Sequence, residues 1–164
     1  MVLNSYGHPV PVVAGALQSK GAASAAKVLK TETTDACDTV SLDLTAAYPE
    51  AKDLESLVRT VVFDRGKRSV AVTDKVRFRA PGTFETPIVT YCDVISDYTP
   101  DRFVIRGVRG RKIEVNVSVA KGGEWEWKTE LLPNPMLVSP KRLAVVLKKP
   151  VSEAEVTVVY KALR

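Results

Sequence analysis

Apolar and polar residues alternate along most of this chain, and this period of two constrains its fold more than any other feature. Between residues 112 and 119, isoleucine and valine occupy every second position, with glutamate, asparagine and serine between them. Residues 69–78 repeat the pattern, with valine and phenylalanine on one side and threonine, lysine and arginine on the other. Because successive side chains of a β-strand point to opposite faces, each run predicts a strand with one buried face.

Turn residues separate these runs at short intervals. Residues 54–64 and 69–78 flank a short loop that contains Gly66, with a length typical of a β-hairpin. Proline and glycine also interrupt the chain at Pro81, Gly107 and Gly122. Further strands are expected at residues 10–13, 25–34, 39–44, 84–95, 102–107, 123–131, 143–148 and 155–162.

Many short strands with turn signals between them are typical of a β-sandwich or a β-barrel. We expect an all-β fold, an antiparallel β-sandwich of two stacked sheets with little helix, in which residues 1–164 form a single domain. Helix is expected only within residues 45–57, where Pro49 and the lack of an apolar stripe leave room for a turn or two. No apolar run approaches the ~20 residues of a membrane helix, so no membrane partner is expected.

The charged residues leave the choice of partner open. A formal net charge of +5 is compatible with an acidic polysaccharide or a nucleic acid. The basic residues form groups, one of which contains Arg142, and solvated faces and turns are their ordinary explanation. The same explanation, as turn or cap residues at strand edges, is expected for Asp35, Asp38, Asp43, Asp64 and Asp74.

Cysteine and histidine are too scarce for a recognisable metal centre. The two cysteines, Cys37 and Cys92, could be buried thiols or one disulfide, and their spacing does not choose between these. No CxxC motif and no Cys/His cluster is present, so we expect no zinc and no other cofactor.

Two tryptophans lie two positions apart, Trp125 and Trp127, and therefore share one face of a predicted strand. They could form a stacking platform for sugar rings, or they could bury a large area in the core or at a sheet edge, which we favour. The nearby glutamates Glu124, Glu126 and Glu130 repel phosphate, so we expect no nucleic-acid partner.

His8 is the only histidine in the chain. Its ordinary explanation is a surface or half-buried side chain in front of a strand bounded by proline. Its functional interpretation is proton transfer, because imidazole is the side chain suited to that task near neutral pH. The single histidine excludes a site built on a histidine pair.

Several segments in the first half of the chain follow one another in a recognisable order. His8 opens a strand that runs to Gly15, and Gln18 follows shortly after. Residues 25–28, 41–49, 59–65 and 70–74 come next. These segments resemble the start of the C-terminal β domain of heparinase II/III-like proteins. There, a second strand and an aspartate-to-tyrosine turn precede a hairpin in which an arginine-bearing strand pairs with a strand ending in aspartate.

The likeness covers about residues 4–80, and it has two departures. Pro9 stands where the family often has asparagine, directly after the histidine. Family β domains can hold zinc with histidines and an aspartate, which the single histidine of this chain does not allow.

The resemblance implies that this chain is the C-terminal part of a longer polysaccharide lyase-like protein, whose α/α-toroid domain is missing from this sequence. Such an enzyme performs β-elimination on a uronic-acid polysaccharide. The resemblance further implies that His8 is the catalytic residue at the substrate cleft and that Tyr6, Gln18 and Tyr48 are substrate-binding residues. Acidic polysaccharide and the helical domain are the implied partners, and the chain alone is expected to be inactive. The family suggests a periplasmic or secreted location, although the start of this chain has no signal-peptide pattern.

Two other functions stay open from the residues. One is a stand-alone carbohydrate-binding β-sandwich, for which exposed tryptophan with basic neighbours would be the sign. The other is a structural β-sandwich that packs against a partner domain, for which a large apolar patch near the amino terminus would be the sign.

Overall fold

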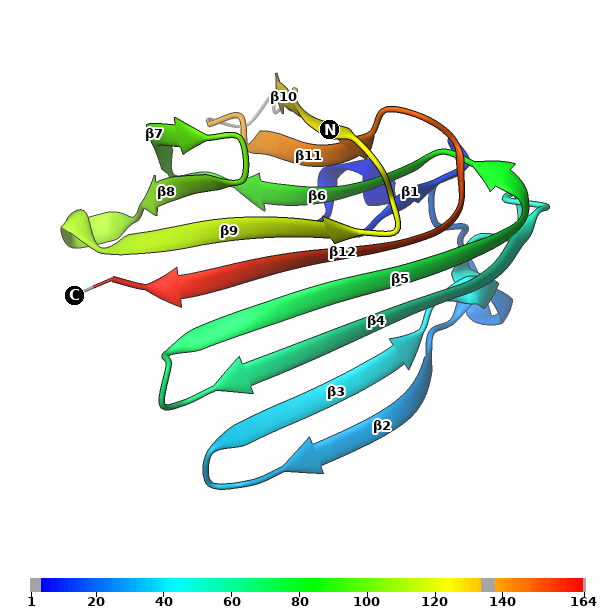
Figure 1. Cartoon of the computed structure of the whole chain (residues 1–164), viewed down its shortest axis with the longest axis horizontal. Helices are drawn as coiled ribbons and strands as arrows, with labels where there is room; N and C mark the ends of the chain where they lie inside the picture. The colour runs from blue at the N-terminus through cyan, green and yellow to red at the C-terminus, as the bar shows by residue number, and fades with distance from the viewer. Residues whose placement is uncertain (1–3, 134–137, 164) are drawn as a thin grey trace.

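The chain folds into two antiparallel β-sheets stacked face to face (Figure 1). The computed structural model describes residues 4–133 and 138–163. The smaller sheet has the strand order β1 (Val12–Val13), β6 (Phe84–Thr90), β11 (Lys141–Leu147), β10 (Trp125–Leu131). The larger sheet has the order β2 (Lys27–Thr33), β3 (Cys37–Asp43), β4 (Leu54–Asp64), β5 (Ser69–Gly82), β12 (Val151–Ala162), β9 (Lys112–Ala120), β8 (Arg102–Arg106), β7 (Asp93–Thr99). The predicted all-β fold of two stacked sheets is confirmed.

The core lies between the sheets and is built from the alternate residues that the period of two assigned to one face. In the larger sheet, Val115 on β9 lies opposite Tyr160 on β12 and Phe103 on β8. These positions face the smaller sheet, because successive strand residues alternate between faces. The largest fully buried aliphatic and aromatic side chains are Val13, Tyr48, Leu57, Val76, Phe84, Phe103, Val115, Leu143, Val145 and Val156.

Within residues 4–133 and 138–163, helical structure is limited to short 3-10 turns. One of them, Thr45–Ala47, lies within the predicted helical range, and β4 begins before that range ends. The expectation that helix is confined to residues 45–57 is wrong in detail, because three further turns form at Ser5–Gly7, Ala22–Ser24 and Val108–Gly110. Each is three residues long, too short to leave a periodic signal. No helix among the described residues is long and apolar enough to cross a membrane.

The expected strand at residues 84–95 is two strands in different sheets. β6 ends at Thr90 in the smaller sheet, and β7 begins at Asp93 in the larger one. The Thr90 hydroxyl accepts a hydrogen bond from the Cys92 backbone at this corner. No glycine or proline marks the corner, which is why the sequence pattern runs through it. Cys37 and Cys92 are both free thiols and half-buried.

The larger sheet extends beyond the smaller one. Figure 1 shows β2 and β3 projecting past the four-stranded sheet. Every residue of β2 is exposed, and its pairing with β3 is interrupted by a bulge between Val28 and Lys30. The charged residues Lys27, Lys30 and Glu32 lie along this edge strand, with Lys30 and Glu32 joined by an ion pair of 2.6 Å.

Candidate functional site

The segment that carries His8 follows the 3-10 turn Ser5–Gly7 and leads into β1. The His8 side chain is exposed. Its backbone is held in a turn, because its N–H donates to the Ser5 carbonyl at 3.1 Å and its carbonyl accepts from Val10 at 2.8 Å. The imidazole therefore projects to solvent from a backbone with fixed local geometry.

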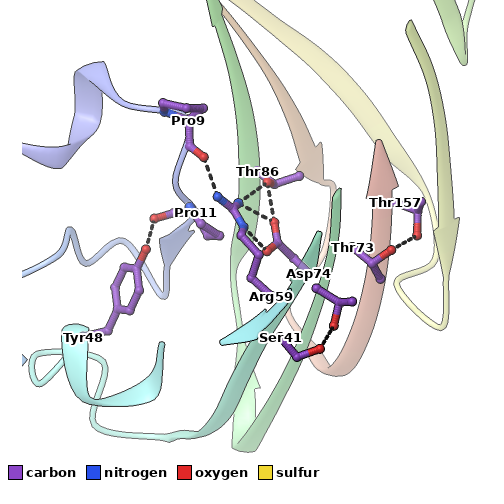
Figure 2. A network of polar contacts seen from close by, with 10 residues as sticks. Pro9, Pro11, Ser41, Tyr48, Arg59, Thr73, Asp74, Thr86 and Thr157 are labelled. Carbon is purple, nitrogen blue, oxygen red and sulfur yellow. Dashed lines mark hydrogen bonds and ion pairs between the residues drawn. The ribbon is translucent and has the colours of Figure 1, made fainter. Parts of the chain in front are cut away.

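A buried arginine holds the residue after His8. Arg59 on β4 donates through Nη1 to the Pro9 carbonyl at 2.6 Å (Figure 2). Its Nε and Nη2 donate to the two carboxylate oxygens of Asp74 at 2.7 and 2.8 Å. The Thr86 hydroxyl on β6 donates to the same carboxylate at 2.7 Å. One guanidinium thus connects the larger sheet, the smaller sheet and the His8 segment.

The Arg59–Asp74 pair is almost removed from water, with side-chain exposures of 12% and 1%. Burial works against the charge of Arg59, but the hydrogen bonds and negative charge of Asp74 outweigh it and raise the pKa of Arg59. The arginine therefore stays protonated, and its two bonds to Asp74 hold the guanidinium in place for its bond to the Pro9 carbonyl.

Tyr48 supports the same segment two residues further on. Its hydroxyl donates to the Pro11 carbonyl at 2.6 Å, and its side chain is 1% exposed (Figure 2). Burial raises the pKa of Tyr48, against the lowering effect of the Arg59 charge and of a hydrogen bond with the Gln18 side chain. The Gln18 backbone in turn donates to the Ser5 hydroxyl at 2.9 Å. Gln18 and Tyr48 are thus brought together around residues 5–11.

Tyr6 lies elsewhere, on the outer face of the smaller sheet. Its ring centre is 4.1 Å from the guanidinium carbon of Arg142, and its hydroxyl donates to Glu130. Arg142 is fully buried beneath it and forms a 2.6 Å ion pair with Glu85. Lys128 lies 3.3 Å from the Tyr6 hydroxyl, and the contact raises the pKa of Lys128. The structure therefore does not place Tyr6 beside Gln18 and Tyr48.

Two hollows open beside Pro9. One, of about 270 Å³, is lined by Arg59, Thr86 and Tyr160 among others. The second, of about 550 Å³, is largely apolar and also includes Tyr160 together with Arg111. Burial raises the pKa of Tyr160 to about 12, so that its hydroxyl is a proton donor at neutral pH. An elongated ligand lying across Pro9 would meet a hydroxyl donor and a cationic side chain.

The residues that sequence reasoning missed are charged groups inside the fold. Asp74 was expected in a solvated turn and Arg142 in a solvated basic group, and both expectations are wrong, since the two are 1% and 0% exposed. For Asp74 a signal existed. It occupies the position between Val72 and Val76 that the alternation assigns to the buried face. Arg142 belongs to the outer face of β11 and is buried because Tyr6 covers it.

Trp125 and Trp127 are both half-buried against the core, as the favoured interpretation had them. They also line an open cleft of about 740 Å³ beside the turn between β9 and β10. Within the described part of the chain, no group of three or more histidine, cysteine, aspartate or glutamate residues is arranged to hold a metal ion.

No family model and no curated protein matches this chain. Solved structures do match. Heparan sulfate lyase HepC from Pedobacter heparinus superimposes with a TM-score of 0.74 and 16% identity, over 97% of this chain and 24% of that one. A crystal structure of heparinase III superimposes with a TM-score of 0.72 and 16% identity, over 95% of this chain and 23% of that one. A heparinase III with methylated lysines superimposes with a TM-score of 0.74 and 12% identity, over 96% of this chain and 24% of that one.

This chain therefore spans about a quarter of the length of the lyases it matches. That share corresponds to one domain of those lyases. The hairpin expected from the resemblance is present, since β4 pairs with β5 and places Arg59 directly opposite Asp74. The second strand does not end at the aspartate, because β5 continues to Gly82. At 12–16% identity the likeness establishes the fold. By its fold, this chain is similar to a β domain of heparinase III, as the order of its first segments predicts.

Proposed function

We propose that this chain is the β domain of a polysaccharide lyase that acts by β-elimination on a uronic-acid polysaccharide. In this proposal the domain shapes one wall of the substrate cleft, contributes His8 to it, and is inactive without a helical partner domain. The observation that carries the proposal is the geometry of the His8 segment. An exposed imidazole projects from a backbone that Arg59 and Tyr48 hold from the protein interior.

The proposed reaction sets clear demands on side chains. The carboxylate of the uronic acid must be neutralised so that the adjacent C–H becomes acidic, and a base must then remove that proton. The electron pair of the C–H bond forms a carbon–carbon double bond. The glycosidic C–O bond breaks, and a proton must reach the leaving oxygen. The products are an unsaturated uronate at one new end and a free hydroxyl at the other.

His8 is suited to two of these tasks. As a cation it would pair with the substrate carboxylate, and as a general acid it would donate a proton to the leaving oxygen. The position of a catalytic group must be controlled closely, because misplacement by about 1 Å can cost ~100-fold in rate. The fixed Pro9 and Pro11 carbonyls supply that control.

The other proposed site residues act around this group. Gln18 lies half-buried beside Tyr48, and the proposal gives both of them a place in the neighbourhood of substrate. Tyr48 is buried and bonded to Pro11, so its contribution runs through the backbone that carries His8. Tyr6, with Lys128 beside its hydroxyl, would meet polysaccharide on the outer face of the smaller sheet.

The proposed partners are an acidic polysaccharide and a helical domain. The net charge of +5 favours association with a polyanion. The helical domain would supply the remaining groups for proton transfer.

The test is an ultraviolet assay for unsaturated uronate on acidic polysaccharides. We expect no product from the chain alone, and product from a longer protein that carries this sequence behind a helical domain. In that protein His8→Ala should lower kcat, while Lys20→Ala, an exposed residue nearby in sequence, should not. Full activity of the His8 variant would leave His8 as an ordinary surface histidine. If the chain alone is active and His8→Ala abolishes that activity, the proposed need for a helical partner domain is contradicted.

A further inference from the structure

The cleft beside the β9–β10 turn combines aromatic and acidic side chains. Its volume is about 740 Å³, within the range of small-ligand sites. Trp125 and Trp127 form one wall, and the acidic residues Asp101 and Glu124 also line it, whereas the Glu126 side chain lies on the other face of β10. None of its lining residues lines the two hollows beside Pro9. It is therefore a separate place on the molecule.

The aromatic wall is fixed in position. The two indole rings meet edge to face with centres 5.4 Å apart, and Phe103 meets Trp127 in the same way at 5.3 Å. The Trp127 Nε1–H donates to the Pro100 carbonyl at 2.8 Å, which joins the wall to the loop on the other side of the cleft. Trp127 is thus anchored in the protein, and its half-buried neighbour Trp125 continues the wall.

The turn that leads into this wall is equally constrained. Gly122 is buried, and a Cβ at that position would lie 2.7 Å from a methyl group of Val119 and 3.1 Å from one of Leu147. The Lys148 backbone N–H donates to the Glu124 carbonyl at 3.0 Å. The cleft is therefore formed before any ligand arrives, which lowers the entropy lost on binding.

The charge of the cleft is opposite to that of the whole chain. Two acidic residues, Asp101 and Glu124, and one basic residue, Lys148, line it, whereas the chain has a formal net charge of +5. The ammonium group lies 3.5 Å from the Glu124 carboxylate and is already engaged by it. Such a site disfavours uronates and sulfates, while its carboxylates can accept hydrogen bonds from hydroxyl and ammonium groups.

We propose that this cleft binds a carbohydrate without acidic groups, either neutral or bearing amino groups. The sugar would place its apolar C–H face on the tryptophan wall and direct its polar groups to Asp101 and Glu124. A ring that carries an ammonium group gains a further attraction, because tryptophan faces and carboxylates both favour a cation. This site is independent of the proposed β-elimination at His8 and binds a different class of sugar.

The test uses the intrinsic fluorescence of the chain, because its two tryptophans both line the cleft. The probes are oligomers of N-acetylglucosamine, oligomers of glucosamine, and hyaluronan oligosaccharides of matched length as the acidic comparison. We expect saturable changes with the first two, tightest with glucosamine, and at least about tenfold weaker binding of the acidic one, a difference of ~1.4 kcal/mol. Calorimetry on the same mixtures gives the affinity independently.

Two variants within the cleft and two controls outside it locate the site. Trp125→Ala should weaken binding of both non-acidic probes by about tenfold. Glu124→Gln changes a residue whose side chain is 83% exposed, so folding is not at stake, and it should reduce the preference for glucosamine over N-acetylglucosamine. Lys128→Ala, on the opposite face of β10, should leave both affinities unchanged, as should His8→Ala.

Four results would overturn the proposal. They are no saturable binding of either non-acidic probe, a tryptophan fluorescence change that saturates at the lowest concentration with the acidic probe, unchanged affinities in Glu124→Gln, and tryptophan-dependent binding of a lysine-rich peptide with none of the sugars. The first three would exclude the proposed class of sugar or its contact with Glu124. The last would show that the cleft binds a basic polypeptide. His8→Ala should not change the affinity of the cleft for either non-acidic probe. Failure of this site and failure of the proposed lyase role are therefore distinguishable.

Discussion

Arg59 and Asp74 occupy directly opposite positions on β4 and β5, and two hydrogen bonds of 2.7 and 2.8 Å join their side chains. The third donor of the guanidinium points away from the sheet to the Pro9 carbonyl. The hairpin and the amino-terminal segment are therefore coupled through one buried ion pair. Whatever weakens that pair changes both the stability of the fold and the order of the residues around His8.

Breaking this pair should be costly. Arg59→Met leaves the Asp74 carboxylate buried without its partner, and we expect a loss of about 3–5 kcal/mol in the free energy of unfolding. Urea denaturation followed by circular dichroism measures it. The double variant Arg59→Met/Asp74→Leu should lose less than the sum of the single variants, because no charge is then left unpaired. Strict additivity would show that the two side chains are not coupled.

The same variant should loosen the His8 segment more than the rest of the molecule. The Val10 N–H donates to the His8 carbonyl at 2.8 Å, and its hydrogen exchange reports on this turn. We expect Arg59→Met to accelerate exchange at Val10 beyond the acceleration seen at core amides such as that of Val156. Equal acceleration at both sites would mean that Arg59 acts on global stability alone.

Tyr48→Phe should cost about 1–3 kcal/mol in stability. The substitution keeps the ring in place but removes the hydroxyl that donates to the Pro11 carbonyl, which leaves that buried carbonyl without its partner. Thermal or urea unfolding gives the value. Tyr91→Phe is the matched control, because Tyr91 is 65% exposed and should change stability by less than about 0.5 kcal/mol.

Alkaline pH should unfold the protein through its buried tyrosines. Burial raises the pKa of Tyr160 to about 12, against about 10 in the unfolded chain. The unfolded state therefore releases this proton first. The stability linked to Tyr160 is complete below about pH 10 and is lost as the pH rises towards 12. The measurement is urea denaturation at several pH values, and Tyr160→Phe should flatten the decline. If the free energy of unfolding falls with pH as steeply in that variant as in the unchanged protein, Tyr160 is not the group responsible.

Gly122→Ala should destabilise the β9–β10 turn by about 1–3 kcal/mol, the range for overpacking a filled interior. The added methyl group would lie 2.7 Å from Val119, so the surrounding side chains must move. Gly66→Ala is the control, because the nearest atom to its Cβ is an Asp64 oxygen at an ordinary 3.5 Å. Equal stability of the two variants would mean that the turn has room to adjust.

The strands were predictable where the alternation is regular and turn residues mark both ends. The hairpin of β4 and β5 around Gly66 is the clearest case, and its strands pair as expected. The corner between β6 and β7 was not predictable, because strand character continues through Tyr91 while the chain moves from one sheet to the other. Local periodicity reports which residues are buried, but not which sheet buries them.

The candidate site was predictable in part, and for a physical reason. His8 is unique in the sequence, and this alone singles it out as a candidate for proton transfer. Its supports were harder to find, since charge usually means exposure. Arg59 and Asp74 are exceptions because each satisfies the other inside the sheet. A charged residue on the buried side of an alternating run, as at Asp74, indicates a partner of opposite charge on a neighbouring strand.

The bulge in β2 has a consequence for how molecules of this protein meet one another. An edge strand offers unpaired backbone groups that another chain can use, and fibril growth proceeds in this way. Here the strand loses its register between Val28 and Lys30, and lysine and glutamate line it. A second molecule would have to match a broken ladder and bury those charges. The open end of an eight-stranded sheet is thereby kept from becoming a template for polymer assembly.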